Sequence, residues 1–260
     1  MEVKLISKSF EPDLTAAAAA VGCYSAKDPY SLLKKMDSKR AGEVLKVVME
    51  SGHHSVVEHA VFTFSVKGVS RALTHQLVRH RVASYSQQSQ RYVRIEEPDV
   101  VVPPSIERDK KKKEMFMNLM KNIWELYKGL TNSKVPVEDA RYILPNATRT
   151  NITITMNARS LLNFFSIRCC VRAQWEIREL AYKMLEIVKK EAPLIFKNAG
   201  ASCEMLGYCP EGEKSCGRYP TLEELKKKAK SSTTSGGSIN EGDASVFPVR
   251  SASCCTDGSI

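Results

Sequence analysis

The chain has 260 residues, of which 43% are hydrophobic and 26% charged, and its formal net charge at pH 7 is +10. This composition excludes a wholly disordered chain, and no apolar run approaches the roughly 20 residues that span a bilayer. The first ten residues contain no long apolar stretch, so we expect a cytoplasmic protein without a signal peptide or membrane partner. The positive charge indicates anionic ligands, namely nucleic acid, nucleotides or polyacidic cofactors.

Hydrophobic periodicity predicts a mixture of strands and helices. Alternating apolar residues predict strands at 3–6, 61–66 and 152–156, with Asn157 as the N-cap of the helix that follows. The strands do not alternate regularly with helices, so we expect an α+β protein with a mainly antiparallel sheet flanked by helices. The predicted helices cover residues 41–50, 70–78, 114–130, 137–144, 159–171 and 173–191.

The last forty residues differ in composition from the rest. Five acidic residues offset five basic ones in the segment 221–260, so residues 1–220 carry the whole positive charge. A short helix is predicted at 222–230, and the polar segment SSTTSGGS follows it. We therefore divide the chain into a folded domain, 1–220, and a tail, 221–260, that is largely disordered from residue 231 onward.

Histidine and positive charge are concentrated in one part of the sequence. All five histidines lie between His53 and His80, and no Asp or Glu occurs from His59 to Ile95. Such a one-sided segment makes a positive potential that attracts phosphate or carboxylate groups. Composition alone favours a basic RNA-binding loop here, and that interpretation stays open. The cations of this segment are Lys67, Arg71, Arg79, Arg81, Arg91 and Arg94.

The order of residues in this segment is more specific than its charge. Arg79-His80-Arg81 is followed, after seven further residues, by Ser89. This spacing resembles the signature of flavin-dependent thymidylate synthases. Other segments resemble the same family in the same order across roughly residues 1–220, namely 52–59, 70–78, 138–145, 157–168 and 173–176.

The resemblance implies both a fold and a reaction. The family has an unusual flavin fold, and the sequence contains neither the G-x-G-x-x-G of a Rossmann domain nor a P-loop. The implied reaction is the reductive methylation of dUMP to dTMP, with 5,10-methylenetetrahydrofolate as carbon donor and FAD, reduced by NADPH, as hydride carrier. The family also implies a homotetramer whose active sites are shared between subunits, with small-molecule substrates and no nucleic-acid partner.

Family motifs assign site residues position by position. The residues that match flavin-binding positions are His53, Ser55, Arg79, His80, Arg81, Gln87, Asn157, Arg159 and Asn163. The residues that match dUMP-binding positions are Gln76, Leu77, Val78, Arg79, Gln87, Gln88, Ser89, Gln90, Arg91, Arg141 and Arg168. Gln87 departs from the family pattern, because many members carry Glu there, so a role that needs negative charge is in doubt.

Arg168 is the predicted catalytic residue. A cation held against the pyrimidine favours the ionised ring and stabilises negative charge that develops in the transition state. Ser89 occupies a position suited to a nucleophile, but the motif places no base beside it, and an unactivated hydroxyl is a poor nucleophile. We therefore interpret Ser89 as a substrate-binding residue.

Helix geometry adds an expectation about assembly. Arg159 and Asn163 are four residues apart and share a face of the predicted helix 159–171. Arg168 lies nine positions beyond Arg159, or about 900° of rotation, which places it on the opposite side. A helix with ligand-binding groups on two sides is natural where a site lies between subunits, in agreement with the implied homotetramer.

The sequence also allows alternative functions. One is a basic RNA-binding module, and another is a flavin- and folate-dependent methyltransferase that acts on uracil in RNA. A zinc site formed by Cys203, Cys209, Cys216 and a further cysteine is a minor alternative, because the spacing is wider than in common zinc motifs. His54, Glu58 and His59 match no zinc-protease pattern, so we expect no bound metal.

Overall fold

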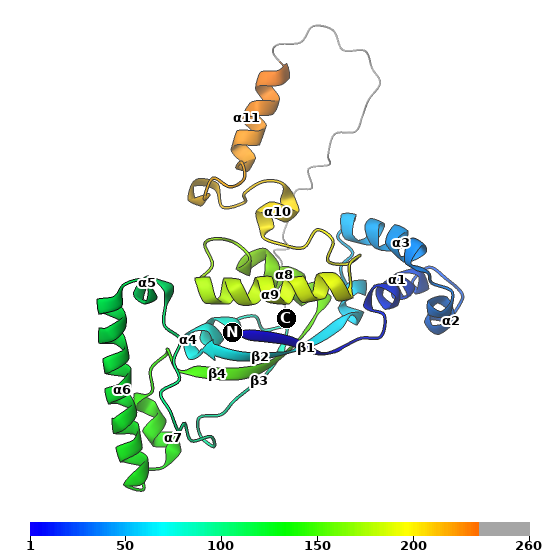
Figure 1. The fold of residues 1–260 in the computed structure, drawn as a ribbon. Coiled ribbons are helices and arrows are strands. Elements are labelled where there is room, and N and C mark those ends of the chain that lie inside the picture. Colours follow the sequence, from blue (N-terminus) through cyan, green and yellow to red (C-terminus); the bar gives the residue numbers. More distant parts are fainter. Residues whose placement is uncertain (234–260) are drawn as a thin grey trace, which may run out of the picture.

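The computed structural model describes residues 1–233, with side chains placed up to residue 230 (Figure 1). The fold is α+β, as predicted. Residues 1–233 contain four strands, β1 (Glu2–Lys8), β2 (Val61–Ser70), β3 (Ser84–Gln87) and β4 (Arg149–Asn157). The helices, with short 3-10 turns labelled η, are α1 (Pro12–Gly22), α2 (Pro29–Lys34), α3 (Ser38–Glu50), η1 (Val56–His59), α4 (Arg71–Leu77), α5 (Pro104–Glu107), α6 (Lys110–Asn132), α7 (Val137–Ala140), η2 (Arg141–Ile143), α8 (Ala158–Arg168), α9 (Trp175–Glu191), α10 (Ser202–Leu206), η3 (Gly212–Lys214) and α11 (Leu222–Thr233).

The strands form one antiparallel sheet in the order β1-β2-β4-β3. The alternation that predicts β2 and β4 reflects a sheet with one buried face, because Phe62, Phe64, Ile152 and Ile154 all lie in the core. Helices α8 and α9 cover this face (Figure 1). On the other face the hydroxyls of Thr63 and Thr155 pair at 3.0 Å.

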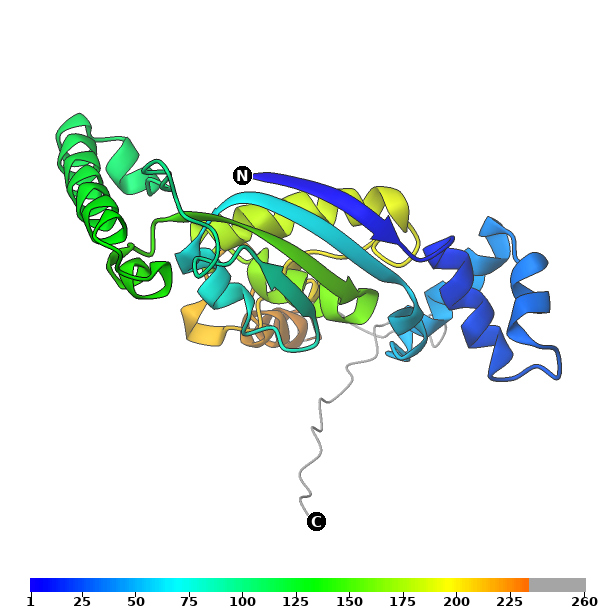
Figure 2. The same cartoon turned by 90° about the horizontal axis from the view of Figure 1, so that it is seen from below.

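Two groups of helices extend from opposite ends of the sheet (Figures 1 and 2). Helices α1, α2 and α3 pack together at one end. Helices α5, α6 and α7 form an arm at the other end, with a small core of its own around Trp124, Tyr127 and Ala140. Among residues 1–233, no helix is long and apolar enough to cross a membrane.

Sequence patterns missed or misplaced several elements. Helices α1 and α2 and strand β3 were not predicted, and the predicted helix 137–144 is divided into α7 and η2. The predicted N-cap is confirmed, because the side chain of Asn157 accepts a hydrogen bond from the backbone N–H of Ser160 at 2.9 Å. Helix α11 ends at Thr233, three residues beyond the predicted helix 222–230. The prediction of a largely disordered tail falls mainly on residues 234–260, which lie outside the described residues.

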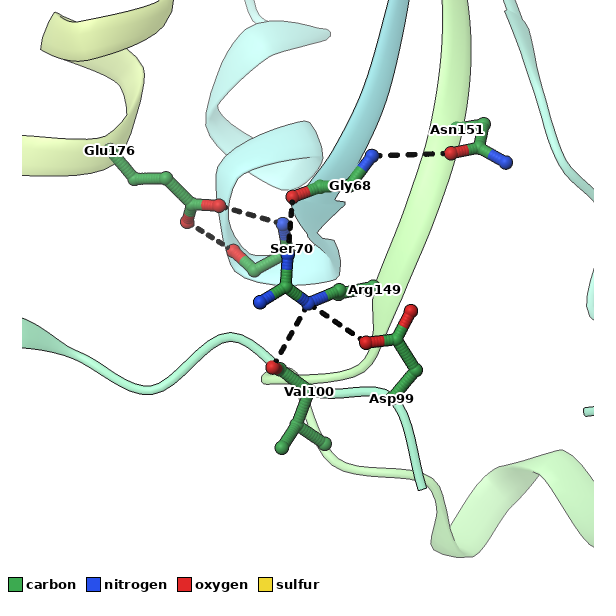
Figure 3. A network of polar contacts seen from close by, with 7 residues as sticks. All are labelled: Gly68, Ser70, Asp99, Val100, Arg149, Asn151 and Glu176. Atoms are coloured by element: carbon green, nitrogen blue, oxygen red, sulfur yellow. Dashed lines mark hydrogen bonds and ion pairs between the residues drawn. The ribbon is translucent and has the colours of Figure 1, made fainter. Parts of the chain in front are cut away.

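A polar network joins the sheet to the arm and to α9 (Figure 3). Arg149, the first residue of β4, donates from Nε to the carbonyl oxygen of Val100 at 3.0 Å and lies 2.9 Å from Oδ1 of Asp99. Its Nη1 also donates to the carbonyl oxygen of Gly68. Gly68 has a left-handed backbone conformation, at φ 76°, and makes an irregularity within β2. Arg149 therefore fixes the start of the arm to an irregularity in the central strand.

Candidate active site

The Arg-His-Arg signature lies in the segment directly after α4 and faces α8 across a cavity of about 710 Å³. Strand β4 continues directly into α8, so the residue that caps this helix also lines the cavity. The cavity brings together seven of the sequence-predicted site residues. They are Arg79, His80, Arg81, Asn157, Arg159, Asn163 and Arg168.

His80 and Arg168 form the best-defined pair in this cavity. Nε of Arg168 donates a hydrogen bond to Nε2 of His80 at 2.9 Å, and the imidazole lies edge-on to Phe164 at 5.0 Å between ring centroids. Burial, together with the nearby Arg168 charge, lowers the pKa of His80 from 6.5 to about 4. The imidazole is therefore neutral near pH 7 and able to accept this bond, while burial also lowers the pKa of Arg168.

The expectation that Arg168 faces away from Arg159 and Asn163 is wrong. All three residues line the same cavity, although Arg168 is nine positions from Arg159. Arg168 is the last residue of α8, and the end of its long side chain reaches His80. The geometry of this helix therefore gives no support for shared sites.

Glu58 is an unpredicted member of this site. Its Oε1 accepts from Nη1 of Arg159 at 2.6 Å, and among the described residues that line the cavity only Glu58 is acidic. The cavity therefore carries an excess of positive charge, and the carboxylate occupies one of its guanidinium groups. In the sequence, Glu58 stands out only as a neighbour of possible zinc ligands.

Two predicted nucleotide-binding arginines meet elsewhere, beside Glu138. Nε of Arg91 donates to Oε2 of Glu138 at 2.8 Å, and Nε of Arg141 donates to the backbone carbonyl of the same residue at 3.0 Å. The pKa of Arg71 is lowered, mainly by burial and to a lesser extent by the positive charge of Arg141, so these two side chains lie near each other. This arginine cluster, Arg71, Arg91 and Arg141, joins α4, the signature segment and the arm.

A second polar cavity of about 620 Å³ contains the predicted residues Gln88, Ser89 and Gln90. Asn151 of β4 donates from Nδ2 to Oε1 of Gln88 at 3.1 Å. The hydroxyl oxygen of Ser89 accepts from the backbone N–H of Arg91 at 3.2 Å, so it orders the local turn. The role of Ser89 in substrate binding stays a prediction.

The other predicted site residues lie outside the lining of both cavities. Leu77 is fully buried in the main core, so its side chain cannot face a ligand, and the adjacent Val78 is exposed. Gln87 donates from Nε2 to the hydroxyls of Thr74, at 3.1 Å, and Thr150, at 3.4 Å. Three further residues line neither of the two cavities. They are the half-buried Gln76 on α4 and the exposed His53 and Ser55 before η1.

The cysteines considered for zinc do not form a metal site in the structure. Cys170, Cys203, Cys209 and Cys216 line a third cavity, of about 240 Å³, on the other side of Arg168. Within residues 1–233, however, no group of three or more His, Cys, Asp or Glu side chains is placed to hold a metal ion. All four cysteines are free thiols.

Comparisons with known proteins agree with one another. A family model described as "Thymidylate synthase complementing protein" matches residues 4–194. The flavin-dependent thymidylate synthase of Clostridium tetani is 44% identical over 241 residues, covering 86% of this chain and 96% of that relative. The flavin-dependent thymidylate synthase of Geobacter sulfurreducens is 46% identical over 227 residues, with coverages of 86% and 97%.

A solved structure supports the fold independently. The UMP/dUMP methylase PolB from Streptomyces cacaoi, bound with 5-Br dUMP, superposes with a TM-score of 0.67 at 24% identity. The match covers 75% of this chain and 93% of that one. Because the family model spans most of the chain and the two relatives are matched over nearly their whole length, the chain belongs to the family of flavin-dependent thymidylate synthases.

Proposed function

We propose that this protein converts dUMP to dTMP by reductive methylation, with 5,10-methylenetetrahydrofolate as carbon donor and FAD reduced by NADPH. The observation that carries the proposal is the cavity between the signature and α8, where guanidinium groups and side-chain amides face one space. Cations suit the pyrophosphate of FAD, and amides suit the polar edges of its rings. Its relatives are named flavin-dependent thymidylate synthases.

The residues present fit a flavin cofactor. We assign its binding to Arg79, Arg81, Arg159 and the amides of Asn157 and Asn163, with His80 as a neutral hydrogen-bonding group. Glu58 now pairs with Arg159, and we infer that the flavin phosphates compete with this carboxylate for the guanidinium. When bound, FAD supplies hydride transfer chemistry. His53, Ser55 and Gln87 remain candidates for the same ligand.

We assign the catalytic role to Arg168. The bond to His80 restricts its side chain, and its partial burial strengthens the field that it exerts on a neighbouring ligand. Placed against the uracil ring, the guanidinium stabilises negative charge on the pyrimidine and favours loss of the N3 proton. Ser89, with Gln88 and Gln90, holds the nucleotide without covalent attack.

Phosphate binding is assigned to Arg91 and Arg141 of the arginine cluster. The Arg91–Glu138 pair is half-exposed, so it contributes little to stability and a phosphate can replace the carboxylate at small cost. A dianionic phosphate between two guanidinium groups makes the stronger, bidentate interaction. Gln76 at the end of α4 completes this set.

We also propose a cytoplasmic homotetramer with active sites shared between subunits. The predicted nucleotide-binding residues are divided among the α8 cavity, the second polar cavity and the arginine cluster, and a neighbouring subunit would supply the missing part of each site. Helix α6 offers an interface, since Met115, Leu119 and Leu126 expose apolar side chains on its surface. Gel filtration combined with assay tests this assembly: full activity in a monomeric fraction rejects it.

The decisive experiment is reconstitution. Purified protein with FAD, dUMP, 5,10-methylenetetrahydrofolate and NADPH should form thymidylate, and omission of any one component should stop the reaction. Tritium release from dUMP labelled at carbon 5 measures turnover. Release from labelled RNA in its place would favour an RNA uracil methyltransferase, and a protein that binds RNA but no flavin would favour a binding module.

Arg168→Ala tests the assignment of the catalytic residue. We expect turnover to be abolished while the flavin stays bound, because the other groups that line the cavity remain. Arg108→Ala, at an exposed arginine after α5, is the matched control and should retain full turnover. Undiminished turnover in Arg168→Ala would remove Arg168 from the mechanism.

A further inference from the structure

Strand β3 carries an aromatic side chain, Tyr85, that contacts the beginning of the signature. Tyr85 pairs with Ile154 of β4 and packs against the main core, so the strand fixes the position of its ring. Its hydroxyl lies against the segment that joins α4 to the signature. There its single proton is shared between the backbone carbonyl oxygens of Leu77, at 3.0 Å, and His80, at 2.8 Å.

The two carbonyls mark the ends of one turn. The backbone N–H of His80 donates to the carbonyl of Leu77 at 3.1 Å, which closes a four-residue turn that contains Val78 and Arg79. The hydroxyl of Tyr85 thus contacts both ends of the turn. This turn carries the site residues Arg79 and His80. Burial raises the pKa of Tyr85 to about 12, so the hydroxyl remains a donor at any working pH.

The same turn determines where the imidazole of His80 lies. Its ring is held edge-on to Phe164, and its Nε2 accepts from Arg168. A shift of the turn would therefore move Arg79 at the cavity and also release the bond that orients Arg168. A chain of direct contacts runs from Tyr85 through the turn and His80 to Arg168.

We propose that Tyr85 is a positioning residue for the flavin-dependent reaction, with its hydroxyl setting the backbone of the Leu77–His80 turn and thereby the His80–Arg168 pair. The proposal rests on the function proposed above. It gives Tyr85 a role through hydrogen bonding to the protein, and not through stacking on a base or on the flavin.

Tyr85→Phe removes the hydroxyl and keeps the ring. We expect the dissociation constant for FAD to rise by up to about fivefold, the factor reached when the whole of one ordinary hydrogen bond serves to hold the turn in its binding conformation, and kcat to fall by a similar or larger factor. The visible absorption spectrum of the bound flavin should also change. Flavin titration, steady-state kinetics with dUMP and thermal unfolding measure these effects on the same preparation.

Thr15→Val is the matched control. The hydroxyl of this half-buried threonine on α1, a helix that contributes no residue to the α8 cavity, donates to the carbonyl of Phe10 at 2.6 Å, so its loss removes a comparable bond. Both variants should lose similar thermal stability, but only Tyr85→Phe should change the affinity for FAD, its spectrum and kcat. Equal effects of the two variants on these quantities, or a Tyr85→Phe protein indistinguishable from wild type, would overturn the proposal. A wild-type protein without flavin-dependent turnover would instead reject the proposed function and this inference with it.

Discussion

The contact between Glu176 and Ser70 joins α9 to the beginning of α4 (Figure 3). Both residues are buried, and the carboxylate accepts from the backbone N–H of Ser70 at 2.8 Å and from its hydroxyl at 2.5 Å. The same hydroxyl accepts from the N–H of Leu73 at 3.0 Å and so caps α4. Because α4 leads directly into the signature, this contact anchors the helix that carries the site.

Glu176→Gln changes one carboxylate oxygen into an amide group that donates and cannot accept. The amide oxygen can still accept from the backbone N–H of Ser70, and the amide nitrogen can donate to the Ser70 hydroxyl, so both contacts persist but lose their charged acceptor. A hydrogen bond to a charged group contributes about 1.5–3 kcal/mol, and one between neutral groups about 0.5–1.5 kcal/mol. We therefore expect the free energy of unfolding to fall by about 1.5–3 kcal/mol. Glu176→Ala loses both bonds, leaves two buried donors without their partner and should cost about 3–5 kcal/mol.

Urea unfolding at fixed protein concentration measures these changes. Ser70→Ala and the double variant complete a cycle that separates the contact from the loss of the helix cap, and we expect a coupling energy of about 1–2 kcal/mol. A loss below about 0.5 kcal/mol in Glu176→Gln, or additive effects in the double variant, would refute this reasoning. The carboxylate would then be replaceable by any side chain of similar shape.

Two further predictions concern single groups. Because burial and Arg168 lower the pKa of His80 from 6.5 to about 4, the unfolded chain binds a proton in this interval that the folded chain does not, so stability should decrease as the pH falls from about 6.5 to about 4. His80→Asn should reduce this dependence of stability on pH. If the slope is unchanged in the variant, another group is responsible for the pH dependence. Within the described part of the chain the buried hydroxyl of Tyr127 has no hydrogen-bond partner, so Tyr127→Phe should be neutral or stabilise the arm by up to about 1 kcal/mol in thermal unfolding. Clear destabilisation would mean that the hydroxyl has a partner, such as a buried water.

The sequence predicted the elements whose burial leaves a simple pattern. Strands β2 and β4 alternate because one face of the sheet is buried against α8 and α9. Strand β3 was missed because it is a short, polar edge strand, with Tyr85 as its one large apolar side chain. Helix α1 contains a run of five alanines, and such a run gives no amphipathic period.

Sequence reasoning grouped residues in space where a motif is local, and it failed where a contact depends on tertiary structure. The family spacing correctly grouped Arg79, His80 and Arg81 with the residues of α8 around one cavity. Glu58 pairs with a residue 101 positions away, and no local pattern identifies such a partner. The position of Arg168 was misjudged because the angle around a helix locates the Cα–Cβ bond and not the end of a long side chain.

The anchoring of Arg149 has a consequence for how the arm varies among proteins of this kind. The chain enters the arm near Asp99 and leaves it at Thr148, and Val100 and Thr148 form an isolated bridge, so the departing and returning segments lie next to each other. Insertions whose two ends adjoin can lengthen, shorten or be exchanged as a module without disturbing the host scaffold. Since this module contributes Arg141, to which we assign phosphate binding, we expect its replacement to change the affinity for the nucleotide and to leave the α8 cavity unchanged.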